Sequence, residues 1–389
     1  MSTYWTTIHN IASTLIQHSI PYQFIDETGL AIQGLDIEKN EVHVEVQWDQ
    51  MESVHDIFEP YTPTTIERTN EQGRFTLVME GTNVVVICRY NTALRTDPYR
   101  IEVKNEGVDL WCQSLYALTD DRDHGKVVQA YLSQKQKEMT EQNESAWNQN
   151  NYQALVNRFG EPETAASKIK KFPEGRIGSV FPFLDNVKDK KIAHLMGSNG
   201  IKATALSLLG AEVTVVDFSK ENAAFAKEVA KECDVEMNYL ISDVLSLKSN
   251  DELRCQYDIV LMELGVLHYF IDLNPLFQVI HQLLKPGGRF ILQEFHPIST
   301  KLITSKGKKH KVDGNYFDPT LERRDVAFSK YATHGEKKEV EVLQRKWTLG
   351  EVVTSVAQQG LTVKVLKEEP NQKVHDIGLP KMFTLIAEK

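Results

Sequence analysis

The chain has 389 residues and a net charge of −10, and it is 41% hydrophobic and 25% charged. This length and composition predict a globular protein of two domains. The acidic balance argues against a general affinity for nucleic acid. The four cysteines lack metal-ligand spacing, and neither a signal peptide nor an apolar stretch long enough to span a bilayer is recognisable. We therefore expect a reduced, cytoplasmic protein without membrane contact and without bound metal.

The first third of the chain has the pattern of a small α+β unit. Apolar positions recur at helical spacing over residues 3–18, and residues 41–46 alternate as a β-strand does. Two more strands are predicted over residues 75–79 and 84–87, and the short polar turn between them indicates a hairpin. A polar, helix-prone stretch at residues 134–143 then leads into the second region.

The second region alternates strand and helix signals to the end of the chain. Its predicted strands are residues 191–196, 212–216, 236–240, 258–262 and 289–293. Repeated βα alternation implies an α/β fold with a doubly wound, mostly parallel sheet and helices on both faces. We place the smaller N-terminal α+β domain at residues 1–132 and the α/β domain at residues 133–389.

A tight turn at residues 197–200 follows the first of these strands and precedes a helix, and the next strand ends on Asp217. Glycines in such a turn let the backbone approach a ligand closely, and the helix N-terminus offers free N–H groups. An acid after the second strand can accept two ribose hydroxyls. The unit predicts a site for an adenosine-type cofactor, although Asp217 taken alone could equally be a strand-end acid or a helix cap.

Residues 143–389 resemble the class I S-adenosylmethionine-dependent methyltransferases. The resemblance rests on features in the family's order: the turn at 197–200, the acid-ended strand at 215–219, the polar turn at 241–244, the strand at 257–263, and the run Leu-Leu-Lys-Pro-Gly-Gly-Arg-Phe at 283–290. It implies a Rossmann-like sheet and S-adenosylmethionine as cofactor. In the last run, the Lys-Pro-Gly-Gly residues are expected to form a turn that sets the next strand.

The resemblance also implies individual cofactor contacts. Asp217 would hold the ribose hydroxyls, Asp243 would accept from the adenine amino group, and Phe218 and Val244 would pack on the ring. The expected cofactor-binding residues are Trp147, Tyr152, Arg158, Gly197, Ser198, Asn199, Gly200, Asp217, Phe218, Ser219, Asp243, Val244, Glu263 and Leu264.

Two features of this set carry alternatives. The first three residues lie in a segment, 143–160, that would fold over the cofactor as a lid helix or simply face the core, and Arg158 would pair with the cofactor carboxylate or lie on the surface. The turn departs from the family, since His194 replaces the usual acid and Met196 and Ser198 replace glycines. We expect a hydroxyl contact from Ser198 in place of close backbone approach.

Candidates for catalysis follow the fourth and fifth strands, because open α/β sheets bind ligands at the carboxyl ends of their strands. They are Glu263, His268, Tyr269 and His296. His268 could instead be a core or capping histidine. The cationic insert at residues 301–311 is expected to cover the acceptor pocket. The chain lacks the Asn/Asp-Pro-Pro-aromatic turn of adenine methylation and a suitably placed cysteine, so the expected acceptor is a small molecule.

Residues 5–95 resemble, more loosely, a nucleotidyltransferase domain. Active members place two metal-binding acids on one strand and a third on a neighbouring strand. Here the strand carries Glu41, His43 and Glu45, whereas the neighbour, residues 84–87, is entirely apolar. Since a divalent cation prefers several oxygen ligands, we interpret the row as the solvent-facing side of an antiparallel strand. The domain is then an inactive accessory, for acceptor recognition or dimer contact.

The sequence as a whole predicts a methyltransferase that uses S-adenosylmethionine on a small molecule. Two rival functions remain at this point. One is an RNA or protein methyltransferase that docks its substrate with the first domain. The other is a cofactor-binding regulator without catalysis, for which the altered turn at residues 197–200 is the argument. A homodimer is the assembly that the accessory domain suggests.

Overall fold

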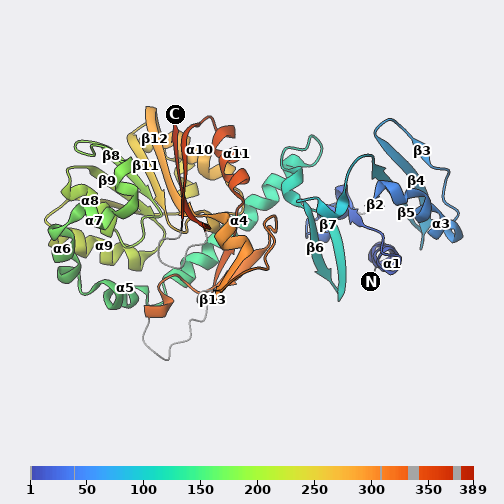
Figure 1. The fold of residues 1–389 in the computed structure, drawn as a ribbon, viewed down its shortest axis with the longest axis horizontal. Coiled ribbons are helices and arrows are strands. Elements are labelled where there is room, and N and C mark those ends of the chain that lie inside the picture. Colours follow the sequence, from blue (N-terminus) through green and yellow to red (C-terminus); the bar gives the residue numbers. More distant parts are fainter. Residues whose placement is uncertain (1, 39, 307–308, 332–340, 371–377) are drawn as a thin grey trace. The chain divides into compact units, whose positions relative to one another are not determined.

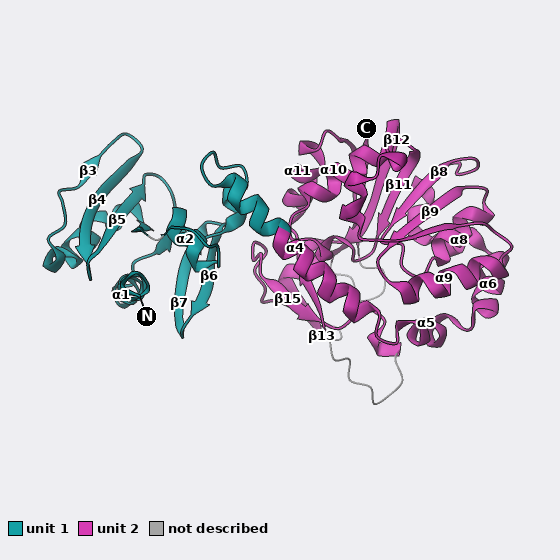
Figure 2. Ribbon diagram, turned by 180° about the vertical axis from the view of Figure 1, so that it is seen from behind, with its two compact units in different colours: residues 1–133 teal, residues 134–389 magenta. Residues whose placement is uncertain are grey.

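The computed structural model describes residues 2–38, 40–306, 309–331, 341–370 and 378–389. The chain divides into two compact units, Met1–Ser133 and Gln134–Lys389, next to the expected boundary (Figures 1 and 2). Helix α4 (Gly125–Trp147) contributes to both units and contains the predicted polar helix. The helices in the described part of the chain include none with the length and apolar character needed to cross a membrane.

The first unit is built on a seven-stranded sheet in the order β3-β4-β5-β2-β1-β7-β6. The predicted helix over residues 3–18, the predicted strand over residues 41–46 and the hairpin of β4 and β5 are confirmed. The elements are α1 (Thr3–Gln17), β1 (Tyr22–Phe24), α2 (Asp26–Ile32), β2 (Glu41–Val46), α3 (Met51–Ile57), β3 (Glu67–Arg68), β4 (Gln72–Met79), β5 (Thr82–Arg89), β6 (Arg100–Asn105) and β7 (Val108–Gln113).

The prediction of a solvent-facing row on β2 is wrong at Glu45. Strand β2 lies inside the sheet, antiparallel to β1 and parallel to β5. Glu45 is only 1% exposed, and its carboxylate accepts hydrogen bonds from the side chains of Gln23 and Arg89. His43 is half-buried between Asp26 and Glu41. The row is buried towards its end because β1 places Gln23 directly opposite Glu45.

The second unit is built on a seven-stranded sheet in the order β10-β9-β8-β11-β12-β18-β17. The five predicted strands are confirmed as β8 to β12, which run parallel, while β18 is antiparallel to β12 and β17. The strands are β8 (Lys191–Leu195), β9 (Glu212–Asp217), β10 (Asn238–Ile241), β11 (Tyr257–Glu263), β12 (Leu284–Phe295), β17 (Thr362–Pro370) and β18 (Pro380–Glu388). The expected Lys-Pro-Gly-Gly turn lies within β12, where the pairing with β11 is irregular.

Helices cover both faces of this sheet, as Figure 1 shows for α8 and α9 on one side and α10 and α11 on the other. The helices are α5 (Asn151–Phe159), α6 (Pro162–Lys171), α7 (Pro173–Ile177), α8 (Ile201–Leu208), α9 (Lys220–Glu232), α10 (Asn274–Leu283) and α11 (Leu349–Gln358). The strand order reverses between β8 and β11. Such a reversal opens a crevice at the carboxyl ends of the strands, where α/β proteins bind ligands.

Two predicted segments differ from expectation. The lid helix at residues 143–160 is broken, because α4 ends at Trp147 and α5 starts at Asn151, with Asn150 at φ 57° between them. The cationic insert forms a π-helical turn (Ile298–Leu302) and the hairpin of β13 (Ile303–Lys306) and β14 (Lys309–Val312). Its residues 307 and 308 lie outside the described residues. A further hairpin pairs β15 (Leu321–Arg324) with β16 (Val342–Arg345).

Candidate active site

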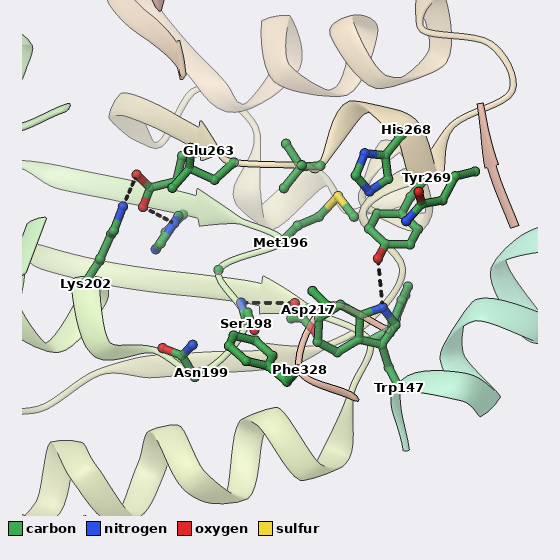
Figure 3. Close-up of a pocket in the computed structure, with 18 of the residues that line it drawn as sticks. Trp147, Met196, Ser198, Asn199, Lys202, Asp217, Glu263, His268, Tyr269 and Phe328 are labelled. Carbon is green, nitrogen blue, oxygen red and sulfur yellow. Dashed lines mark hydrogen bonds and ion pairs between the residues drawn. The ribbon is translucent and has the colours of Figure 1, made fainter. Parts of the chain in front are cut away.

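A cavity of about 310 Å³ lies at the carboxyl ends of β8, β9 and β11 in the second unit (Figure 3). Strand residues and the loops after them form its floor, while the end of α4 and the segment before β16 contribute the remaining walls. It is lined by Trp147, His194, Met196, Gly197, Ser198, Asn199, Lys202, Asp217, Phe218, Glu263, Leu264, Gly265, Val266, His268, Tyr269, Phe295, Asp325, Ala327, Phe328 and Gln344.

The turn after β8 keeps a left-handed backbone although two of its glycines are replaced. Met196 has φ 51° and Ser198 has φ 47°, values that glycine adopts freely and other residues rarely do. Gly197 between them must remain glycine, because a Cβ atom there would lie 2.9 Å from both His194 Nδ1 and Val215 Cγ1. The backbone of this turn therefore keeps the left-handed conformation that glycine favours, and Met196 and Ser198 are strained in it.

Asp217 ends β9 with its carboxylate held by the backbone. Oδ1 accepts the N–H of Ser219 at 2.9 Å, and Oδ2 accepts the N–H of Ser198 at 3.1 Å. Burial raises the pKa of this carboxyl, against the lowering effect of those hydrogen bonds. Since Asp217 also lines the cavity, a bound hydroxyl can reach the acceptor capacity that remains on the carboxylate.

Glu263, the last residue of β11, forms the centre of a buried charge cluster (Figure 3). Its Oε2 pairs with the ammonium of Lys202 on α8, and its Oε1 lies 3.5 Å from Nε2 of His194. Burial alone would raise the pKa of Glu263, but the hydrogen bond from His194 and the charge of Lys202 outweigh it, so the pKa is lowered. Glu263 is therefore ionised and suits binding of a cation better than proton transfer.

Aromatic rings surround the other side of the cavity. The indole of Trp147 donates a hydrogen bond to the hydroxyl of Tyr269 at 3.2 Å, and its ring meets those of Tyr269 and Phe328 edge-on. Phe218 follows Asp217 on the same wall. Such faces can stack on a purine ring or stabilise a sulfonium cation.

His268 lines the cavity from the loop after β11 and is half-buried. Burial and, to a lesser extent, the positive charge of Lys346 lower its pKa to about 4. The imidazole is therefore neutral near pH 7, and its unprotonated nitrogen can accept a hydrogen bond. Burial raises the pKa of the neighbouring Tyr269 to about 12, which keeps that hydroxyl protonated.

Glu294, on β12, holds the loop that carries His268, and sequence reasoning missed it. Its carboxylate accepts four backbone N–H groups: Gly265 at 2.6 Å, Val266 at 2.8 Å, Leu267 at 3.2 Å and Phe295 at 2.7 Å. No motif marks a carboxylate that binds backbone across two strands, so only the three-dimensional pairing of β11 with β12 reveals this role.

Ten of the predicted site residues come together around the cavity, and the others do not line it. Those that line it are Trp147, Gly197, Ser198, Asn199, Asp217, Phe218, Glu263, Leu264, His268 and Tyr269. Those outside the lining are Tyr152, Arg158, Gly200, Ser219, Asp243, Val244 and His296.

The residues outside the lining have other partners. Tyr152 donates to Glu228, and Arg158 lies over the ring of Tyr331, because both project from α5 beyond the break in the expected lid. Asp243 accepts the N–H of Leu245 as a helix cap, and Val244 packs in the core. His296 pairs with Glu368 on β17, 2.7 Å away. The insert at residues 301–311 contributes no described residue to the cavity.

Several lining residues were not singled out from sequence. Lys202 could have been found, because it is the second residue of the helix that follows the turn. Phe328 and Gln344 come from a distant part of the chain, and only the fold brings them to the cavity.

Comparison with known proteins bears on this unit. Residues 196–292 match the family model described as a methyltransferase domain. The chain is similar to ubiquinone biosynthesis O-methyltransferases from Idiomarina loihiensis, 25% identical over 138 residues, and Azotobacter vinelandii, 27% identical over 138 residues. Each match covers 36% of this chain and 56% or 58% of the relative, so the chain spans about half the length of these curated relatives.

Two solved structures also align with the chain. An S-adenosylmethionine-dependent methyltransferase from Mesorhizobium loti is 20% identical, with a TM-score of 0.43, and the alignment covers 56% of this chain and 100% of that one. One from Clostridium acetobutylicum is 17% identical, with a TM-score of 0.40, and the alignment covers 56% and 91%.

Residues 196–292 of the second unit thus match a methyltransferase domain, the class that the sequence predicted, and S-adenosylmethionine is the cofactor that this class implies. The described residues fit this cofactor. Two buried polar atoms of residues that line the cavity, Ser198 Oγ and His194 Nδ1, have no hydrogen-bond partner within the described part of the chain. The first unit lies outside the matched residues, 196–292.

Proposed function

We propose that the second unit transfers a methyl group from S-adenosylmethionine to a small molecule. The observation that carries the proposal is the charge pattern of one cavity, in which Asp217, the Glu263–Lys202 pair and neutral His268 face the same space. Two relatives named as O-methyltransferases of ubiquinone biosynthesis support a small-molecule acceptor. The cofactor, when bound, supplies a methyl group activated by a sulfonium.

The residues of the cavity divide the binding of that cofactor among them. Asp217 accepts the ribose hydroxyls. Glu263 and Lys202 lie side by side with opposite charges, which suits the zwitterionic amino-acid end, with the carboxylate at Lys202 and the ammonium at Glu263. Trp147 and Phe328 exclude water and offer aromatic faces. This assignment gives Lys202 the role that the sequence suggested for Arg158.

The non-catalytic alternative loses its main argument. That argument was the loss of glycines from the turn after β8, but Met196 and Ser198 keep the left-handed conformation that glycine would adopt. Asp217, Glu263 and Lys202 also still face one cavity, so the donor site is intact despite the altered turn.

Calorimetry with S-adenosylmethionine, S-adenosylhomocysteine and nicotinamide dinucleotides tests cofactor binding. We expect the first two to bind and the dinucleotides not to bind. Release of S-adenosylhomocysteine, followed by mass spectrometry, then tests transfer with separate small-molecule, RNA and protein fractions of a cell extract. Release with the small-molecule fraction supports the proposal, and release only with RNA or protein would favour the docking alternative. Tight dinucleotide binding without response to the methyl donor would refute the proposal.

For the first unit we propose an accessory role without nucleotide transfer, in acceptor recognition or in a homodimer. The proposal is supported by Glu45, whose carboxylate is occupied by Gln23 and Arg89. Incubation of the whole protein with nucleoside triphosphates and magnesium should yield no nucleotide transfer, and any measurable transfer would overturn it. Sedimentation of the whole chain tests the homodimer. The cytoplasmic location stays a prediction.

A further inference from the structure

The part of α4 that belongs to the second unit buries three side chains that can form hydrogen bonds. Gln136 and Asn143 are two helical turns apart, and Trp147 follows one turn later, so the three lie on the same side of the helix. Their exposed fractions are only 7%, 1% and 8%. Burying a polar side chain is costly unless it is hydrogen-bonded, so the partners of these residues indicate what this face of α4 does.

Gln136 holds the backbone of the loop after β11. Its Oε1 accepts the N–H of Ile271 at 2.6 Å, and its Nε2 donates to the carbonyl oxygen of Tyr269 at 3.0 Å. One side-chain amide thus satisfies a donor and an acceptor of the loop, as a neighbouring strand would. Tyr269 lines the cavity of about 310 Å³, whereas Gln136 does not. Gln136 therefore fixes a wall of the cavity from behind.

Asn143 holds a second segment in the same way. Its Oδ1 accepts the N–H of Leu343 at 2.7 Å, and its Nδ2 donates to the carbonyl oxygen of the same residue at 3.1 Å. Leu343 lies on β16 directly before Gln344, which lines the cavity. Asn143 itself does not line it. Any effect of Asn143 on a ligand must therefore pass through β16.

The two held segments meet at the hydroxyl of Tyr269. The side chains of Trp147 and Gln344 both donate hydrogen bonds to this hydroxyl, and the bond from Trp147 is 3.2 Å long (Figure 3). Because α4 carries Trp147 and binds the backbone at the other two segments, one helix sets the relative positions of all three side chains. A wall that is held in place before the ligand arrives loses less conformational freedom on binding.

We propose that Gln136 and Asn143 are positioning residues of the donor site, and that they hold the wall of Trp147, Tyr269 and Gln344 in the arrangement that the adenosine part of the cofactor requires. The inference rests on the proposed function and deepens it. Neither amide touches the ligand or takes part in the transfer, and each acts through the peptide groups that it binds. An apolar side chain of similar size would fill the same space but leave those groups unpaired.

The first test removes one amide and keeps its volume. Gln136→Met should weaken binding of S-adenosylhomocysteine by about tenfold, because the unpaired peptide groups no longer fix the loop after β11. Methylthioadenosine should lose affinity by the same factor, since it retains the adenosine part. Gln142→Met is the matched control, because Gln142 lies on the same helix and donates to the backbone of Glu341 in an exposed hydrogen bond. The affinities of this control should stay within about twofold of the parent values.

The folded fraction of each variant separates positioning from a loss of stability. Calorimetry is done at a temperature at which thermal unfolding shows at least about nine-tenths of the protein to be folded. Partial unfolding then changes the apparent affinity by no more than about 1.1-fold, so a tenfold loss must come from the folded site. Equal affinities of the parent protein and Gln136→Met would overturn the inference.

The second test restores the lost contact with a proton. In Gln136→Glu, a protonated carboxyl can donate to Tyr269 and accept from Ile271, whereas an ionised one can only accept. The ratio of variant to parent affinity for S-adenosylhomocysteine should be near one at acidic pH. The ratio should fall as the pH rises through the pKa of the introduced carboxyl, which burial raises. Using the ratio removes the pH dependence that both proteins share.

Asn143→Asp tests the second amide by the same measurement. For either residue, a ratio that stays constant across the pH series contradicts its assignment as a positioning residue. A purely structural role predicts such a constant ratio, because it does not depend on one donated hydrogen bond. Failure of S-adenosylhomocysteine to bind the parent protein would instead refute the proposed function itself, so the two failures are distinguishable.

Discussion

Each of the two units buries a carboxylate at or near the end of a central strand, and the two differ in what surrounds it. In both Glu45 and Asp217, burial raises the pKa of the carboxyl. Glu45 is closed off by the side chains of Gln23 and Arg89. Asp217 is held by backbone N–H groups and faces a cavity of about 310 Å³. Burial and a raised pKa alone therefore do not distinguish a candidate binding residue from a structural carboxylate, whereas access to an open cavity does.

Glu294 extends this comparison within the second unit, because its carboxylate is as fully occupied as that of Glu45 although it lies close to the site. Occupied carboxylates should affect stability when they are changed, and open ones should affect ligand affinity. Each of the following experiments would break or sharpen that distinction.

Glu294→Gln should have the largest effect. An amide N–H₂ group would face backbone N–H donors that the carboxylate now satisfies, so we expect a loss of about 3 kcal/mol in the free energy of unfolding. Chemical denaturation measures it. Glu388→Gln is the control, since Glu388 forms an exposed pair with Lys364 and should change stability by less than about 0.5 kcal/mol. Similar stabilities of the two variants would show that the loop after β11 does not depend on Glu294.

Asp217→Asn should weaken binding of S-adenosylhomocysteine by about 1.5–3 kcal/mol, the range for hydrogen bonds to a charged group, and should change stability less. Because burial raises the pKa of Asp217, the carboxylate becomes protonated at a higher pH than an ordinary aspartate. As the pH is lowered, the affinity of the parent protein for S-adenosylhomocysteine should therefore begin to fall at a pH above the ordinary pKa of an aspartate. The Asp217→Asn variant should not show this fall. Calorimetry across a pH series measures both effects. Unchanged affinity in Asp217→Asn would show that Asp217 has only a structural role at the end of β9.

Lys202→Met should weaken S-adenosylhomocysteine binding by about tenfold through loss of a charge-assisted contact. Methylthioadenosine, which lacks the amino-acid end, serves as the internal control and should bind both proteins equally. If the two ligands lose affinity together, Lys202 acts by holding Glu263 and the fold of the turn, and the assignment of the carboxylate to Lys202 is wrong.

Glu45→Gln should have the smallest effect of these substitutions, and only the stability of the protein should change. The charge-assisted contact with Arg89 becomes a neutral one, so we expect a loss of about 1 kcal/mol, read from thermal unfolding. Affinity for S-adenosylhomocysteine should be unchanged. A clear drop in that affinity would mean that the first unit contributes to the donor site, and the contrast between the two units would fail.

The sequence alone determined the features that depend on local pattern. The βα alternation predicted the parallel strands β8 to β12, and the order of turn, acid and later strands identified the methyltransferase domain. Asp217 was singled out because it ends the strand that follows the tight turn and its helix, and it lines the cavity. These signals survive in sequence because neighbours along the chain create them.

Only the tertiary structure decided which side chains share a space. Sequence spacing could not show that Lys202 pairs with Glu263, or that Phe328 and Gln344 reach the same cavity. The burial of Glu45 depends on Gln23 and Arg89, which come from two other strands. Because the helix breaks after Trp147, Arg158 lies over the ring of Tyr331 and does not line the cavity. Burial, pairing and access to a cavity arise from residues far apart in the chain, and hydrophobic periodicity within one segment carries no information about them.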